Sequence, residues 1–250
     1  MARTFKVLSA LLSYPDKNIV SAAPQMTDVL QDEKLLTQRQ IRLLQPLVDE
    51  LGSGDLYDNQ ERYVLLFDRT RSLSLHLFEH VHGESRDRGP AMVDLKSVYE
   101  KAGLFVSANE LPDYLPLFLE FLSTQPLNEA LELIGQPAHI FAALAERLRK
   151  RKSSYAAVFT ILSTLANADP NAAEVQQLLA EPEFDPNDLE ALDAAWEDEE
   201  VRFGPGAETQ CGSGDLASKL RAANRPPPGL EIPASPRPQT VFTHSRARNA

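Results

Sequence analysis

The sequence predicts an all-α fold, and this prediction depends on two observations. Apolar residues recur at the spacing of a helix face almost throughout the chain, as Leu8, Leu11 and Leu12 do near its start. Runs that alternate apolar and polar residues, which are typical of strands, are scarcely present. Of the 250 residues, 43% are hydrophobic, which is enough for one core of ordinary size. We therefore expect a single-domain helical bundle.

The helices predicted in the first part of the chain are separated by short polar or proline-containing segments. The first ends at Pro15, because proline disfavours continuation of a helix. Ile41, Leu44 and Leu47 give the third its apolar face, and Asp55 can cap the fourth. In order, these helices cover residues 4–14, 19–30, 37–51, 55–67 and 73–80.

The remaining predicted helices follow the same apolar spacing, which is clear at Phe141, Leu144 and Leu148. Pro90 stands in a first helical turn, where proline is tolerated, and Gly103 is a good stop. Asp113, which follows a proline, is the candidate N-cap of the next helix. In order, these helices cover residues 90–101, 114–123, 127–134, 138–151, 155–166, 172–179 and 187–201.

The composition changes near the end of the chain. Residues 181–200 hold ten acids and no lysine or arginine, and seven of the 18 prolines follow residue 201. The segments that follow cannot bury enough apolar surface to offset the entropy lost on ordering. We expect an all-helical domain at residues 1–203 and a disordered, proline-rich tail at 204–250.

The net charge and the number of cysteines indicate the kind of partner and the cellular compartment. A net charge of −11 argues against nucleic acid as a ligand and favours a basic partner, or serves solubility alone. No apolar run approaches the roughly 20 residues of a membrane span, so we expect no stable membrane insertion. The N-terminus lacks a signal-peptide cleavage site, and the single cysteine, Cys211, suits a reducing compartment. These features predict a cytoplasmic protein.

Residues 65–95 are unusually rich in ionisable groups. They include four arginines, five acids and three of the five histidines, His76, His80 and His82. If 73–80 is one helix, His76 and His80 share a face, and imidazoles at that spacing can bind a transition metal. The same side chains also fit a structural hydrogen-bonding network, so both interpretations stay open.

The turn at 83–90 offers Arg–carboxylate pairs. Arg86 and Arg88 flank Asp87, and their guanidinium groups can reach Glu79, Glu84 or Asp68. Such pairs can fix the angle between two helices or form the rim of a site for a ligand or peptide.

A second motif places two carboxylates three residues apart at a helix start. Asp113 can cap this helix, which leaves Glu110 available to a cation. The helix that follows is apolar on nearly every face over residues 115–122. It is either central to the core or one wall of a groove for an amphipathic helix.

Signatures of enzymes are missing. The chain has no G-x-G-x-x-G, P-loop, G-x-S-x-G or H-E-x-x-H motif. Cys211 lies in a glycine- and serine-rich stretch that offers no fixed base. We therefore do not expect an enzyme.

Two strings carry a family resemblance: FEHVHGESRDRGPAMVDL at 78–95 and ELPDYLPLFLEFLS at 110–123. They resemble the TorD-like family of redox-enzyme maturation proteins, and within it the chaperones that assemble respiratory nitrate reductase. The similarity extends from LLSYPD at 11–16 to LDAAWEDEEVRF at 192–203, and it includes QCGSGD at 210–215. The end beyond about residue 225 is not covered.

The resemblance implies a TorD-like helical bundle that acts as a cytoplasmic chaperone. Its client would be the apo catalytic (alpha) subunit of nitrate reductase, including the N-terminal twin-arginine-like segment. The chaperone would hold the client ready for iron–sulfur and molybdopterin guanine dinucleotide insertion before membrane docking, without stably binding a cofactor itself. Molybdenum cofactor biosynthesis proteins are further partners that the resemblance allows.

The family motif acid-x-Pro-Asp-His is associated with signal-peptide binding. Glu110, Pro112 and Asp113 match it, but Tyr114 replaces the histidine, which weakens any role of an imidazole or of nucleotide binding here. The residues expected to bind the client are Glu79, His80, Glu84, Arg86, Asp87, Arg88, Glu110, Pro112, Asp113, Tyr114, Leu115 and Phe118.

Two other classes of function remain open. One is a metal- or cofactor-handling protein that uses His76, His80 and His82, and the other is a helical scaffold or dimerisation module.

Overall fold

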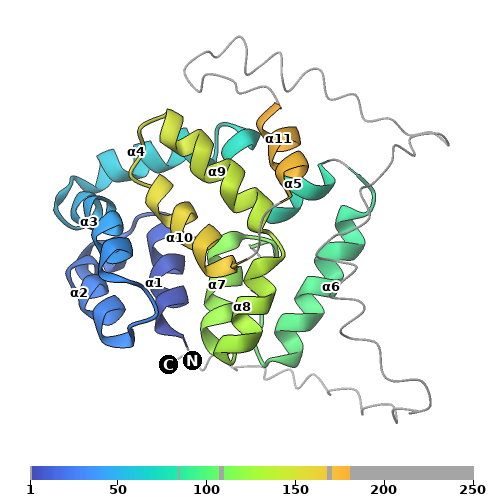
Figure 1. Cartoon of the computed structure of the whole chain (residues 1–250), viewed down its shortest axis with the longest axis horizontal. Helices are drawn as coiled ribbons and strands as arrows, with labels where there is room; N and C mark the ends of the chain where they lie inside the picture. Colours follow the sequence, from blue (N-terminus) through green and yellow to red (C-terminus); the bar gives the residue numbers. More distant parts are fainter. Residues whose placement is uncertain (1, 84, 107–109, 168–170, 181–250) are drawn as a thin grey trace, which may run out of the picture.

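The computed structural model describes residues 2–83, 85–106, 110–167 and 171–180, and over these ranges the all-α prediction is confirmed. Figure 1 shows the arrangement of the helices. They are α1 (Arg3–Leu12), α2 (Lys17–Glu33), α3 (Gln38–Ser53), α4 (Leu56–Phe67), the 3-10 turn η1 (Arg71–Leu73), α5 (Leu77–His82), α6 (Arg88–Lys101), α7 (Leu115–Thr124), α8 (Leu127–Gly135), α9 (Ala138–Lys150), α10 (Ala156–Ala166) and α11 (Ala172–Ala180).

Local capping explains where several helices begin. Asp55 caps α4 as predicted, and its carboxylate accepts the Tyr57 N–H at 2.8 Å. Asp16 caps α2, and Thr37 with Gln40 forms a reciprocal capping box at the start of α3. These caps satisfy N–H groups that have no partner within the helix.

The core lies between two groups of helices. α1 packs against α2 and α7 and also touches α10, while α9 pairs with α10 and carries α11 on another side (Figure 1). α7 is central, because five of its side chains are at most 3% exposed. These are Leu115, Phe118, Leu119, Phe121 and Leu122. The interpretation of 115–122 as a core helix is confirmed.

The single helix predicted at 73–80 is wrong. Residues Arg71–Leu73 form η1, the chain then extends through His76, and α5 begins at Leu77. The extended residues pair with the chain before α7 in an isolated antiparallel bridge between His76 and Tyr114. A backbone pairing with a distant segment therefore overrides the local helical spacing.

The predicted helix at 187–201, the domain boundary near 203 and the tail at 204–250 lie outside the described residues. In the part of the chain that is described, none of the helices has the length and apolarity that crossing a bilayer requires.

Candidate functional site

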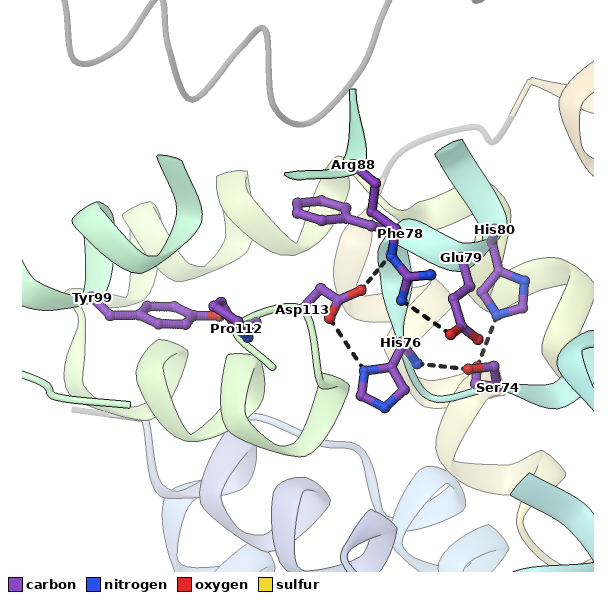
Figure 2. Close-up of polar contacts among 9 residues, drawn as sticks. All are labelled: Ser74, His76, Phe78, Glu79, His80, Arg88, Tyr99, Pro112 and Asp113. Carbon is purple, nitrogen blue, oxygen red and sulfur yellow. Dashed lines mark hydrogen bonds and ion pairs between the residues drawn. The ribbon is translucent and has the colours of Figure 1, made fainter. Parts of the chain in front are cut away.

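The motifs at 65–95 and 110–116 meet at one place, which we call the polar junction: residues 74–80 and 112–115 together with Arg88 (Figure 2). The Leu115 N–H donates to the Leu75 carbonyl at 2.8 Å, and the Leu77 N–H donates to the Asp113 carbonyl at 3.1 Å. These two bonds flank the His76–Tyr114 bridge and fix the starts of α5 and α7 beside each other. The two candidate motifs therefore form one structural unit.

Asp113 lies at the centre of the polar junction and is fully buried. One carboxylate oxygen accepts the Phe78 N–H at 3.1 Å, and the other lies 3.2 Å from Nδ1 of His76 (Figure 2). The carboxylate thus satisfies a donor in the first turn of α5 and holds the His76 ring.

The prediction that Asp113 caps the helix after it is wrong. Tyr114 is the N-cap of α7, and no side chain caps it. The reason is that α7 has few free donors: Pro116 lacks an N–H, and the Leu115 N–H is bonded to Leu75. The donor that needs a partner is the Phe78 N–H of α5, which Asp113 accepts.

The Asp113 carboxylate also changes the titration of His76. Burial alone lowers the pKa of His76, but the hydrogen bond and charge of Asp113 outweigh it and leave the pKa above its ordinary value. Because a carboxylate accepts, Nδ1 of His76 is the donor in this pair.

Glu79 and Arg88 join α5 to α6. Arg88 donates to Glu79 at 3.0 Å, and both side chains are 25% exposed. Burial raises the pKa of Glu79, but hydrogen bonds from Ser74 and Arg88 outweigh it, so the pKa lies below its ordinary value. This is one of the Arg–carboxylate pairs that the sequence offered, and it fixes the angle between the two helices.

The three neighbouring histidines do not converge. His76 turns to Asp113, whereas Nε2 of His80 donates to the Ser74 carbonyl at 2.8 Å. The ring of His82 packs edge-on against Phe78. Among the described residues, no group of three His, Cys, Asp or Glu side chains is placed to hold a metal ion. The metal interpretation required one helix face, and the extended chain at His76 removes it.

Burial lowers the pKa of His80, and the nearby positive charge of Arg147 acts in the same direction. The hydrogen bond from Nε2–H to the Ser74 carbonyl opposes this shift, because a protonated ring donates it as well, but burial outweighs it.

Two tyrosines that sequence reasoning missed complete the surroundings. The Tyr99 hydroxyl, from α6, donates to the Pro112 carbonyl at 2.8 Å and ties α6 to the start of α7 (Figure 2). The Tyr63 and Tyr114 hydroxyls are 2.9 Å apart. The one signal in the sequence that could have found them is a tyrosine on the apolar face of a predicted helix, because a buried hydroxyl needs a hydrogen-bond partner.

The twelve residues predicted to bind a client differ widely in exposure. Exposed are Arg86, Asp87 and Glu110. Partly exposed are Glu79, His80, Arg88 and Tyr114. Buried are Pro112, Asp113, Leu115 and Phe118, while Glu84 lies outside the described residues. The side chains of Leu115 and Phe118 belong to the core, so the expectation that they line an accessible groove needs correction.

The helical fold and the motifs at 65–95 and 110–116 are those of a known protein family. The family described as nitrate reductase delta subunit matches residues 32–160, and the chain belongs to this family. It is 41% identical over 215 residues to NarJ of Escherichia coli K12, whose name is nitrate reductase molybdenum cofactor assembly chaperone. That match covers 86% of this chain and 90% of NarJ.

Two further proteins are similar to this chain. NarW of Escherichia coli K12 is 40% identical over 211 residues, which cover 84% of this chain and 88% of NarW. The crystal structure of a redox enzyme maturation protein from Archaeoglobus fulgidus is 22% identical, with a TM-score of 0.49, and covers 67% of this chain and 94% of that one. The resemblance predicted from the two strings is confirmed. NarJ is named as an assembly chaperone, a non-enzymatic role, in agreement with the expectation that this chain is not an enzyme.

Proposed function

We propose that this protein is a cytoplasmic chaperone that binds the apo catalytic subunit of respiratory nitrate reductase, including its N-terminal segment. It keeps the subunit competent for insertion of the molybdenum cofactor before membrane docking, and it binds no cofactor stably. Support comes from membership of the family and from the name of NarJ, which covers nearly the same length. Molybdenum cofactor biosynthesis proteins are proposed as transient partners.

The observation that carries a peptide-binding role is the combination of acid and apolar side chains at the edge of the polar junction. Glu110 is exposed. Burial is the main cause that raises the pKa of Tyr114, and the charge of Glu110 acts in the same direction. The next residue, Leu111, has an apolar side chain that is 47% exposed. An exposed apolar side chain next to a carboxylate suits a basic, amphipathic helix.

In this proposal the client's apolar face contacts Leu111, and its basic residues approach Glu110 and Glu79. The net charge of −11 favours the encounter with a basic segment. The side chains of Asp113, Leu115 and Phe118 are buried, so in this proposal they do not touch the client. Their part is indirect: they fix the backbone at 112–115.

A double substitution at the exposed edge tests the proposal. The Glu110→Gln/Leu111→Ser variant should bind a synthetic peptide of the client's N-terminal segment at least about tenfold more weakly, because it removes one charge and one apolar contact. Isothermal titration calorimetry measures the loss.

The matched control is Glu129→Gln/Leu127→Ser, which changes an exposed acid and an exposed leucine on α8. It should bind like the wild type. Equal affinity of both double variants would place the client elsewhere on the protein.

A further inference from the structure

A small pocket opens beside the polar junction and is lined in part by His76 and Tyr114. Its volume is about 160 Å³. At roughly 30 Å³ per water this is room for about five waters, which is enough to admit one side-chain head group. Its lining comes from the end of α4, the turn after α1 and the bridged pair, and includes Tyr14, Tyr63, Phe67, Asp68, His76 and Tyr114.

Aromatic rings form most of the wall, and they hold one another in place. The Tyr63 ring meets Tyr14 edge-on with centroids 5.5 Å apart, and it meets Phe67 at 5.0 Å. The rings of His76 and Tyr114 lie 5.5 Å apart across the bridge. Aromatic faces attract cations, and the attraction is stronger where water is excluded.

The hydrogen-bond chain in the wall leaves an acceptor on Tyr114, one of the lining residues. The Tyr63 hydroxyl lies 2.9 Å from the Leu12 carbonyl and must donate to it, because a carbonyl only accepts. Tyr63 therefore accepts from the Tyr114 hydroxyl, which lies 2.9 Å away. Because the Tyr114 hydroxyl gives its only hydrogen to Tyr63, its oxygen can still accept a hydrogen bond from another group.

His76 is oriented in the same sense. Its Nδ1–H donates to Asp113, so Nε2 is an acceptor only when the ring is neutral, at a pH above the raised pKa of His76. His76 is among the residues that line the pocket, and its ring adds to the aromatic wall.

Asp68 adds a negative charge to these acceptors. Asp68 is exposed. Burial is the main cause that raises the pKa of Tyr63 and of Tyr114, and the charge of Asp68 acts in the same direction. Within the described part of the chain, Asp68 has no ion pair that would neutralise it. The pocket therefore combines ring faces, the hydroxyl oxygen of Tyr114 and a carboxylate.

We propose that this pocket binds one guanidinium group, supplied by an arginine of the client's basic N-terminal segment. The inference deepens the proposed function and rests on it for the source of the arginine. A guanidinium is planar, weakly hydrated and able to donate to several acceptors while it stacks on aromatic rings. An ammonium group is strongly hydrated and lacks this planar fork, and an anion would be repelled by the Asp68 carboxylate.

A cross between protein and peptide variants tests the pocket. The wild type and Asp68→Asn are each titrated with the client's N-terminal peptide, with arginine either retained or replaced one at a time by uncharged citrulline. Asp68→Asn should weaken the native peptide about tenfold, because a charge-assisted contact is lost. One citrulline position should cause a similar loss in the wild type and little further loss in Asp68→Asn, which shows coupling between the two groups.

The matched control is Asp58→Asn, which makes the same change near the other end of α4, about 15 Å away at 1.5 Å per residue. It should leave the affinity unchanged. Equal loss in Asp58→Asn and Asp68→Asn, or no citrulline position that couples to Asp68, would overturn the pocket assignment. A lysine peptide that binds as tightly as the arginine peptide would overturn the choice of guanidinium.

A second probe separates the pocket from the proposed function. N-acetyl-arginine amide, titrated into the isotopically labelled full chain, should shift the NMR signals of Tyr114 and His76 in the wild type and not in Asp68→Asn. If these shifts occur while the client peptide fails to bind, the proposed function is wrong and the pocket stands. If the peptide binds without coupling to Asp68, the pocket is wrong and the proposed function stands.

Discussion

Replacing Asp113 by alanine should lower the free energy of unfolding by about 3 kcal/mol, because two buried hydrogen bonds lose their acceptor. The Phe78 N–H is then left in the core without a partner, and the His76 ring loses the group that orients it. Urea denaturation followed by circular dichroism measures the loss. Glu110→Ala, an exposed acid three residues earlier, is the control and should leave the unfolding midpoint almost unchanged.

The isosteric Asp113→Asn variant separates charge from shape. Its amide oxygen still accepts the Phe78 N–H, so the loss should be smaller than for alanine. Because the pKa of His76 is raised in the native state, its pair with Asp113 stabilises the fold at acidic pH, and this contribution is lost as the pH rises through that pKa. The difference between the wild type and Asp113→Asn should therefore be larger at about pH 5.5 than at about pH 8. A difference independent of pH would contradict the assignment of the His76 pair.

Arg147→Met should also destabilise the protein, by about 2–3 kcal/mol. Arg147 is fully buried in α9 and donates to the Ser72 carbonyl at 2.6 Å and to the Leu178 carbonyl. It thereby ties η1 and α11 to the same helix. Methionine keeps the packing of the stem but supplies no donor, so both carbonyls lose a charge-assisted bond.

Hydrogen exchange gives this prediction a local readout. Amides of α11 should exchange faster in Arg147→Met than in the wild type, because the helix loses its tether. Arg149→Met is the matched control: that side chain lies on the same helix, is 57% exposed and pairs with Glu146. If Arg147→Met is as stable as Arg149→Met, the tethering role is contradicted.

The helices could be predicted because the signals that form them are local. Asp55 caps its helix from within its own sequence, and the apolar faces of α1, α3 and α9 repeat at helical spacing. Gly103, the predicted stop, adopts a φ of +80° just after α6, which glycine tolerates best. Boundaries moved by a few residues, as is common at helix ends.

What could not be predicted depends on partners far away in the sequence. His76 and Asp113 are 37 residues apart, and the pairing of their segments turned a predicted helix into η1, an extended stretch and α5. In the same way, Asp113 looked like a local cap and instead serves Phe78. Arg147 gave no sign of burial, because nothing near it in sequence reveals the two carbonyls that it meets.

Both strings that carry the family resemblance, at 78–95 and 110–123, contribute residues to the polar junction. Glu79 and Arg88 set the position of α6, while Asp113 joins α5 to the start of α7. The acidic and apolar edge at Glu110 and Leu111 is presented by this framework.

The most direct test of the proposed function is co-purification from cells that make nitrate reductase. The tagged full-length chain should retain the catalytic subunit that lacks its molybdenum cofactor, and should retain much less of a subunit from which the N-terminal segment has been deleted. Mass spectrometry and cofactor analysis identify what is bound. Recovery of the cofactor-loaded subunit to the same extent as the apo form, or of neither, would contradict the proposal.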